Sequence, residues 1–442
     1  MVRKFDPGAI RELAYALSGA PDDYDALLEQ IGEARFVLLG EATHGTHEFY
    51  RERAKITRRL IEEKGFSAVA IEGDWPDAYR VHCYVTGQNQ GTAGDALTGF
   101  KRFPTWMWRN AEVLEFLGWL RAHNDALPEG ERVGFYGVDL YSLYASVQAV
   151  LSVLDRIDPP AAARARARYA CFDHYSGDSR MYGYASGLGI ADSCEREVTQ
   201  QLIDMSEQRL SWLRRGQRRE QEQIFYAEQN ARLIKNAEEY YRSMFRGSVS
   251  TWNLRDRHMM DTLDALAEHL GRRGAPAKIV VWAHNSHVGD ARATAMGDAG
   301  EWTLGQLARE RAPGSSYLLG FTTYEGSVTA ASDWDGPAEL KRVRPALEAS
   351  HEAVLHATGA PCFLLFTNDD VVRAAFGQER LERAIGVVYR PDTERTSHYF
   401  SARLSQQFDA VIHVDRTRAV EPLESSARGR QLELPETFPF AV

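Results

Sequence analysis

The feature that most constrains this chain is a short apolar run that leads through an ionisable loop into a helical pattern. Residues 35–39 (RFVLL) have the length and composition of a β-strand, and Gly40 permits a sharp turn after it. A polar segment from Glu41 to Glu48 follows, and an amphipathic pattern then continues to a helix stop at Gly65. In an open parallel sheet such a loop lies at the carboxyl end of the strand, where ligands bind. The sequence therefore predicts an α/β fold with a site beside this loop.

The same unit recurs further along the chain. Three more apolar runs have strand length: 67–71, 133–138 and 278–283. Each one ends in ionisable side chains, which are Glu72, Asp139, and the pair His284 and His287. Parallel strands bring their carboxyl ends to one edge of a sheet, so we expect these groups to meet there. This convergence favours a catalytic or metal-binding cluster over helix capping and structural ion pairs.

The strand pattern stops in the middle of the chain. Residues 159–275 contain long amphipathic segments and a Tyr/Gly/Ser-rich stretch at 175–189, which we expect to form a loop. We therefore predict a helical insertion at 159–275, acting as a cap or lid. It separates a first part of the α/β core at 1–158 from a second part at 276–442. The core is expected to be a parallel β-sheet flanked by helices.

Composition limits the classes of function. The chain has 442 residues, of which 44% are hydrophobic and 26% charged, as in a globular enzyme. A net charge of -10 argues against nucleic acid or an anionic membrane as the main partner. No apolar stretch reaches the roughly 18 residues of a membrane span and no signal-peptide core is found, so we expect a cytoplasmic protein. The four cysteines lack C-x-x-C spacing, so neither a disulfide framework nor a zinc–thiolate site is expected.

His44 is the strongest candidate for a general base. Glu41, three residues earlier, can orient its imidazole, which then takes a proton from water near neutral pH. The alternative is a histidine at a helix start that bonds only to backbone. Of His284 and His287, one is expected to bind substrate while the other packs. Glu72, buried at a strand end, is expected to have a raised pKa.

Aromatic residues near the strand ends are candidates for the wall of a substrate cleft. Trp75, Trp106 and Tyr141 follow or precede the predicted strands and suit a large apolar substrate. Buried aromatic side chains more often belong to a hydrophobic core, and that alternative stays open.

A metal site is an alternative use of the same cluster. Its ligands would be drawn from Glu41, His44, Glu72, His284 and His287, as in zinc or iron sites. The H-E-x-x-H spacing is absent, and so is the G-x-S-x-G motif of serine hydrolases. No phosphate-binding motif follows any strand, so no nucleotide cofactor is expected. Attack by activated water is the simplest remaining chemistry, and a non-catalytic ligand-binding protein is a further alternative.

Several motifs in order resemble one known family. They are LLGEATHGTHEFYRERAKITRRLIEEKGFSAVAIEGDWPDA, FPTWMWRN, WNLRDRHM, VVWAHNSHVGDARA, YRPDTERTSHYF and FDAVIHVDRTRAVEPL. Together they look like the erythromycin esterase family, which includes macrolide esterases and succinoglycan-biosynthesis-type relatives. The resemblance implies a parallel α/β core with a helical insertion and a small α+β subdomain. It also implies hydrolysis of a macrolactone ester by an imidazole-activated water, an activity associated with macrolide resistance.

The resemblance also implies roles for single residues. The family's catalytic acid and base fall on Glu41 and His44, its helix arginine on Arg53 and its strand-end glutamate on Glu72. Its histidine pair falls on His284 and His287, which with Arg53 would stabilise an oxyanion or bind the substrate carbonyl. On an unbroken helix Arg53 lies about half a turn away from His44. Either the helix begins after His44, near Thr46, or Arg53 has another function.

The expected activity is therefore that of a carboxylic-ester or lactone hydrolase acting on a small molecule. A metal-dependent hydrolase and a biosynthetic acyl-transfer enzyme are rivals that use the same Glu/His cluster. The wider superfamily contains metal- and haem-associated members, which keeps a divalent metal possible. The oligomeric state and the function of residues 389–400 are not predicted.

Overall fold

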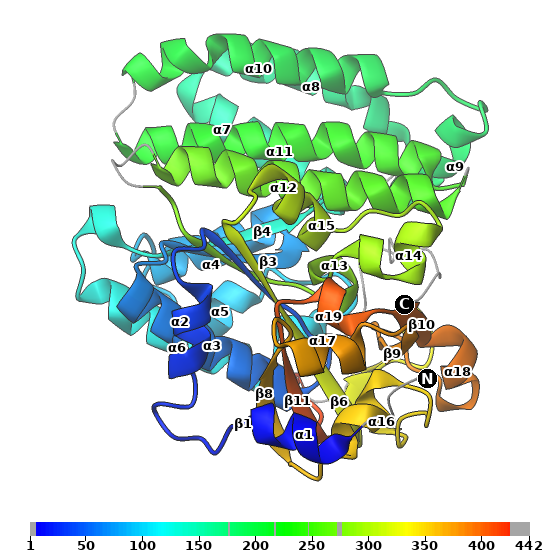
Figure 1. Ribbon diagram of the computed structural model, residues 1–442. Helices are drawn as coiled ribbons and strands as arrows, with labels where there is room; N and C mark the ends of the chain where they lie inside the picture. Colours follow the sequence, from blue (N-terminus) through cyan, green and yellow to red (C-terminus); the bar gives the residue numbers. More distant parts are fainter. Residues whose placement is uncertain (1–5, 176, 216–217, 246, 272–275, 425–442) are drawn as a thin grey trace.

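The computed structural model describes residues 6–175, 177–215, 218–245, 247–271 and 276–424. A central sheet runs through the lower part of the molecule, and a group of long helices lies above it (Figure 1). The α/β class predicted from the sequence is confirmed.

The main sheet has nine strands, and its centre is parallel. Its order is β1-β8-β11-β6-β2-β5-β3-β4, with β7 paired to β6. The bounds are β1 Tyr15–Ala16, β2 Phe36–Leu39, β3 Ala68–Asp74, β4 Gly134–Asp139, β5 Ile279–Trp282, β6 Ser316–Ala330, β7 Glu339–Val343, β8 Cys362–Phe366 and β11 Ala410–Thr417. Strands β11, β6, β2, β5, β3 and β4 pair in parallel, whereas β1, β7 and β8 pair antiparallel to their neighbours. The predicted parallel core therefore carries antiparallel additions.

Helices cover both faces of this sheet, which explains why its central strands are apolar throughout. In β2, Phe36 and Leu38 belong to one buried hydrophobic cluster, and Val37 and Leu39 belong to the other. The helices of the first half are α1 Pro7–Leu13, α2 Asp25–Ile31, α3 His47–Lys64, α4 Trp75–Val85, α5 Ala93–Leu97, α6 Ala111–Asp125 and α7 Leu143–Ile157. Those of the last part are α13 Asn285–Val288, α14 Ala295–Asp298, α15 Leu304–Arg311, α16 His351–His356, α17 Asp370–Phe376, α18 Glu394–Ser397 and α19 Leu404–Gln407.

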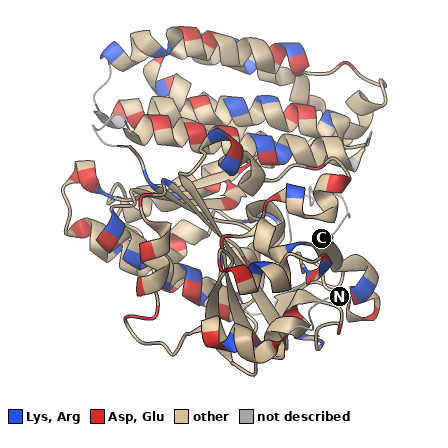
Figure 2. Cartoon of the chain, viewed as in Figure 1, with Lys and Arg blue, Asp and Glu red and all other residues tan. Residues whose placement is uncertain are grey.

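The middle of the chain forms a helical cap. It consists of α8 Pro159–Tyr169, α9 Ser179–Gly187, α10 Glu195–Arg215, α11 Arg218–Ser243 and α12 Ser248–Gly271. The predicted loop at 175–189 is wrong, because α9 occupies most of it; Asp178 caps that helix by accepting hydrogen bonds from the N–H groups of Arg180 and Met181. Basic and acidic residues are interspersed along the cap helices, as on a solvated surface (Figure 2).

A disulfide lies within this cap. Cys171 and Cys194 are bonded to each other, with their Cα atoms 5.9 Å apart. The spacing of the cysteines gave no indication of a disulfide framework, and this bond was not predicted. The residues are separated by 23 positions, and only the folded path of the chain brings them together. Cys83 and Cys362 are not in a disulfide.

A small α+β unit lies near the end of the described chain. Strands β9 Arg380–Arg383 and β10 Tyr399–Ala402 form an antiparallel pair, and α18 precedes β10. Ala384, Phe400 and Ala402 make a separate small core there. This unit is the subdomain that the family resemblance implied. Among the described helices of the chain, none is long and apolar enough to cross a membrane.

Candidate active site

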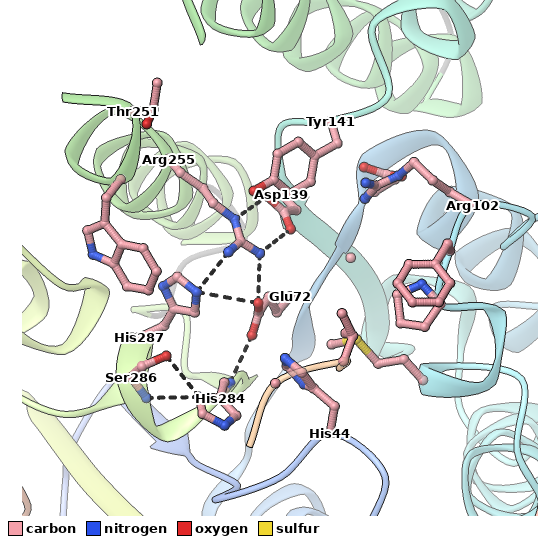
Figure 3. A pocket seen from close by; sticks show the side chains of 18 of the residues that line it. His44, Glu72, Arg102, Asp139, Tyr141, Thr251, Arg255, His284, Ser286 and His287 are labelled. Atoms are coloured by element: carbon pink, nitrogen blue, oxygen red, sulfur yellow. Dashed lines mark hydrogen bonds and ion pairs between the residues drawn. The ribbon is translucent and has the colours of Figure 1, made fainter. Parts of the chain in front are cut away.

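A cavity of about 490 Å³ opens at the carboxyl ends of the parallel strands. It is lined by all the strand-end groups predicted to converge, except Glu41: His44, Glu72, Asp139, His284 and His287. They meet because β2, β5, β3 and β4 are consecutive in the sheet. The cap closes the other side with residues of α11, α12 and the segment between them, including Tyr240, Met244, Thr251, Trp252 and Arg255. Figure 3 shows the ionisable part of this cavity.

Glu41 orients the imidazole of His44. One carboxylate oxygen of Glu41 lies 2.9 Å from Nδ1 of His44, and the other accepts a 2.7 Å hydrogen bond from Arg53. Glu41 and Arg53 are fully buried. Because Nδ1–H donates to the carboxylate, the neutral imidazole carries its lone pair on Nε2. This is the tautomer that a general base in the cavity requires.

Arg53 acts on Glu41 and does not line the cavity. Helix α3 begins at His47 after the cap residue Thr46, so the first of the two alternatives given for Arg53 is correct. From the second turn of that helix its guanidinium reaches Glu41 and packs over the rings of Tyr50 and Trp282. A direct bond from Arg53 to a substrate carbonyl is therefore not supported by this geometry.

Glu72 is the centre of a buried ion network. Its Oε1 accepts a 2.7 Å hydrogen bond from Arg255, and its Oε2 accepts one of 2.8 Å from the backbone N–H of His284. Arg255 also makes two bonds to Asp139, of 3.0 and 2.7 Å. Burial raises the pKa of Glu72, but the positive charges of His287 and Arg255 outweigh it and lower that pKa well below its usual range. The raised pKa expected from the sequence is therefore wrong, because the partner Arg255 was not foreseen.

His284 lies against His44, with ring centroids 4.8 Å apart. Nδ1 of His284 accepts a hydrogen bond from the backbone N–H of Ser286, which places the proton of the neutral ring on Nε2. Burial and the neighbouring His44 lower the pKa of His284 well below its usual value. His284 is therefore neutral at pH 7. The close approach of this loop requires Gly40, since a Cβ there would lie 2.2 Å from Oδ1 of Asn285.

His287 is held by residues of the cap. Its Nδ1 lies 3.0 and 2.9 Å from the two carboxylate oxygens of Asp256, and Trp252 stacks on its ring at 4.5 Å. Its Nε2 lies 2.9 Å from Nη1 of Arg255 and 3.4 Å from Oε1 of Glu72. Both predicted histidines thus line the cavity, and neither one only packs in the hydrophobic core.

The aromatic wall differs from the prediction in two of three positions. Tyr141 lines the cavity, with the guanidinium groups of Arg102 and Arg255 over its ring at 4.5 and 4.9 Å. Trp75 and Trp106 do not line it and belong to the two hydrophobic cores, so the core alternative is correct for them. The aromatic residues that line the cavity besides Tyr141 are Phe100, Phe103, Trp108, Tyr240, Phe245, Trp252 and Trp334.

The carboxylates of the cluster are engaged by protein donors. Both oxygens of Glu41 and of Glu72 already accept hydrogen bonds from protein donors, and both nitrogens of His287 have partners. Only imidazole nitrogens of His44 and His284 are left to bind an ion. Across the residues that the structure describes, no group of three or more His, Cys, Asp and Glu side chains is placed to hold a metal.

Arg255, Asp256 and Trp252 are the site residues that sequence reasoning missed. They lie on one side of α12, because positions 252, 255 and 256 have the spacing of a helical face. All three stand in the motif WNLRDRHM. The sequence signal that could have identified them is the placement of a tryptophan, an arginine and an aspartate on one face of a helix.

Known proteins share this sequence and fold. The family model described as Erythromycin esterase matches residues 61–417. Erythromycin esterase type II of Escherichia coli is 23% identical over 422 residues, which cover 90% of this chain and 94% of that protein. The putative hydrolase YbfO of Bacillus subtilis (strain 168) is 23% identical over 406 residues, covering 86% of this chain and 83% of that protein.

Solved structures agree with the fold. A succinoglycan biosynthesis protein superposes with a TM-score of 0.77 at 20% identity, covering 94% of this chain and 97% of the other. A histidine-to-asparagine mutant of the erythromycin esterase EreC, in its open conformation, gives a TM-score of 0.66 at 17% identity, covering 92% and 96%. Because the family model spans most of the chain, including the strand-end residues Glu72, His284 and His287, this protein belongs to the erythromycin esterase family of hydrolases.

Proposed function

We propose that this chain hydrolyses a carboxylic ester or lactone, with His44 as the general base that activates water. The observation that carries the proposal is the buried chain Arg53–Glu41–His44. It fixes the imidazole by a 2.9 Å bond to Glu41 and leaves the lone pair on Nε2 in a ring that lines the cavity. A positioned base of this kind contributes roughly 10²- to 10⁴-fold in rate.

The reaction proceeds by direct attack of water on the ester carbonyl. His44 removes a proton from water as the oxygen bonds to the carbonyl carbon, and the carbonyl π electrons move onto its oxygen. Collapse of this tetrahedral intermediate breaks the ester C–O bond and gives a carboxylic acid and an alcohol. His284 and His287 line the cavity beside His44, and we assign them to the carbonyl oxygen and the leaving oxygen.

The lining of the cavity supports a large apolar lactone as the substrate. The cavity of about 490 Å³ lies within the usual range for small-molecule pockets and has many aromatic side chains in its wall. The Escherichia coli relative is named an erythromycin esterase. These observations support a macrolide macrolactone as the first substrate to test.

The test is mass spectrometry of substrate incubated with the full chain. Erythromycin and a panel of simple esters and lactones are each incubated with the parent and with His44→Asn, and with His174→Asn as a control at an exposed histidine. The proposal predicts a gain of one water in at least one substrate with the parent and the control, and none with His44→Asn. Equal conversion by His44→Asn overturns the assignment of the base. Recovery of every substrate unchanged supports a binding protein instead.

A further inference from the structure

Asp256 and His287 make a second carboxylate–imidazole pair, in which the imidazole lines the cavity and the carboxylate is buried behind it. Both carboxylate oxygens of Asp256 lie within 3.0 Å of Nδ1 of His287. Asp256 is fully buried, and its Oδ1 also accepts a 2.7 Å hydrogen bond from the backbone N–H of Leu304. The carboxylate is thus fixed by a third element and holds a proton on Nδ1 of the imidazole.

The plane of this imidazole is fixed as well. Trp252 stacks on the ring of His287 with an interplanar angle of 6°. Trp252 lies one turn before Asp256 on α12, so the same helical face supplies the stacking partner and the carboxylate. The cap therefore determines both the orientation and the tautomer of a histidine that the sheet supplies.

The second ring nitrogen of His287, Nε2, has a neighbour suited to either protonation state. When Nε2 is unprotonated, it accepts a hydrogen bond from Nη1 of Arg255 at 2.9 Å. Oε1 of Glu72 lies 3.4 Å from the same Nε2 and is the acceptor available to its N–H when the ring is protonated (Figure 3). A group that must give up and regain a proton in each turnover needs both partners.

The charges around His287 favour its protonated form. They are Asp256 and Arg255 from α12, Glu72 from β3, His284 from its own turn, and Glu301 from the segment before α15. Burial lowers the pKa of His287, but the carboxylates of Asp256 and Glu72 outweigh it and raise that pKa. His284, beside it, has a lowered pKa. Two titrating groups whose environments move them apart are typical of an acid and a neutral partner.

This inference rests on the proposed hydrolysis. We propose that Asp256 is a positioning residue, contributed by the cap, which holds His287 as the general acid of the reaction. As the tetrahedral intermediate collapses, the C–O bond breaks and its electron pair goes to the leaving oxygen. The proton on Nε2 of His287 passes to that oxygen, which leaves as an alcohol. His287, now neutral, accepts the hydrogen bond from Arg255. His44 releases to solvent the proton that it took from water, and His287 takes up a proton from solvent, so both residues return to their starting states.

A matched pair of esters tests this assignment. An alkyl ester expels a basic alkoxide and needs the acid, whereas a p-nitrophenyl ester expels a stable phenolate and does not. With the ethyl and p-nitrophenyl esters of butanoic acid, Asp256→Asn and His287→Asn should lose roughly 10²-fold or more of kcat on the ethyl ester and less than about tenfold on the other. Asp264→Asn is the control, since Asp264 lies on the same helix and pairs with Arg311 outside the cavity. Equal losses on both esters overturn the proposal.

The pH profile gives a readout that a merely structural role would not change. His287 must be protonated to act, so the rate on the alkyl ester falls as pH rises through its pKa. Asp256→Asn removes the charge that raises this pKa, and the alkaline limb should therefore move to lower pH. Asp256→Glu should move it back toward the parent. An alkaline limb that stays in place contradicts the assignment.

An NMR titration tests the pair even if neither ester is turned over. In the full chain labelled with ¹⁵N-histidine, the imidazole signal lost in His287→Asn identifies His287. Its Nδ1 should remain protonated throughout the titration of the parent, and the pKa should fall in Asp256→Asn. An unchanged pKa overturns the proposal. Failure of the proposed hydrolysis is seen separately, as p-nitrophenyl ester turnover that survives His44→Asn.

Discussion

Arg255 on the cap helix α12 donates a 2.7 Å hydrogen bond to Glu72, which stands near the end of strand β3 and 183 residues earlier in the chain. The same guanidinium bonds Asp139 at the end of β4. One cation therefore joins the cap to two neighbouring strands of the sheet. The cap is part of the site and not only a cover over it.

Replacing Arg255 by Met should destabilise the fold strongly. It leaves Glu72 and Asp139, both buried, without their counter-charge, and removing one partner of a buried ion pair costs about 3–5 kcal/mol. The free energy of unfolding in urea measures this loss. Arg311→Met is the control, because Arg311 pairs with partly exposed carboxylates and should lose only about 0–1 kcal/mol. Equal stability of the two variants would refute this account of the network.

Truncating Trp334 should affect large substrates selectively. Trp334 lines the cavity and packs edge-to-face against Phe103, with ring centroids 5.7 Å apart. Trp334→Ala should raise KM for a macrolactone about tenfold or more and leave KM for a small ester within about twofold. Trp119→Ala, on α6 and outside the cavity lining, is the control for general damage. A uniform change in KM for both substrates would rule out a wall at this position.

The chain should lose stability as pH falls from about 6.5 to about 4. Burial lowers the pKa of His258 to about 4, while an unfolded histidine titrates near 6.5. In this window the unfolded state binds a proton that the folded state does not, so stability is complete above about pH 6.5 and declines below it by about 1.4 kcal/mol per pH unit. His351 and His398 have pKa values lowered in the same way, to about 4.

A variant isolates the contribution of one histidine. Asn236 donates a hydrogen bond to Nδ1 of His258 at 2.8 Å. A glutamine in place of His258 keeps an acceptor for this bond, its side-chain oxygen, and does not titrate. His258→Gln should reduce the slope of unfolding free energy against pH in this window. His174→Gln, at an exposed position, should not. Identical slopes for the parent and His258→Gln would mean that His258 is not buried in its neutral form.

Two of the four cysteines should be in a disulfide and two should be reduced. Alkylation of the denatured chain without reductant should label Cys83 and Cys362 only, and reduction should expose Cys171 and Cys194 as well. Peptide mass spectrometry distinguishes the four sites. Complete labelling without reductant would show that the pair is not oxidised in the purified protein.

The central parallel strands, the groups at their ends and the Glu41–His44 pair were predictable from short-range sequence patterns. Strands β2, β4 and β5 were predicted to within one residue of their observed bounds, and the strand ends at Glu41, Glu72, Asp139 and His284 were placed at one edge because parallel strands require it. The Glu41–His44 pair is local, since both residues lie in one loop. The separation of the chain into three parts stays a prediction.

The remainder of the site depends on contacts that no local pattern encodes. Arg255 lines the cavity and Asp256 bonds His287, but both stand on a helix whose sequence is that of an ordinary amphipathic segment, so the residues they contact could not be predicted. Without Arg255, burial alone predicted the wrong direction for the pKa of Glu72. Trp75 follows a strand just as a wall residue would, yet it stacks on Tyr136 in the core. In each of these cases the outcome depends on the direction of a side chain, which the sequence alone does not give.

The most direct test of the central claim is kcat of His44→Asn and Glu41→Gln on whichever ester or lactone the parent turns over fastest. His44 supplies the base, and Glu41 fixes its tautomer through the 2.9 Å bond. Both variants should give the circular dichroism spectrum of a folded chain, although Glu41→Gln leaves the buried Arg53 without its counter-charge and should be less stable than the parent. The kcat value should fall by roughly 10²- to 10⁴-fold in each. A folded His44→Asn variant whose kcat stays within about twofold of the parent would contradict the account.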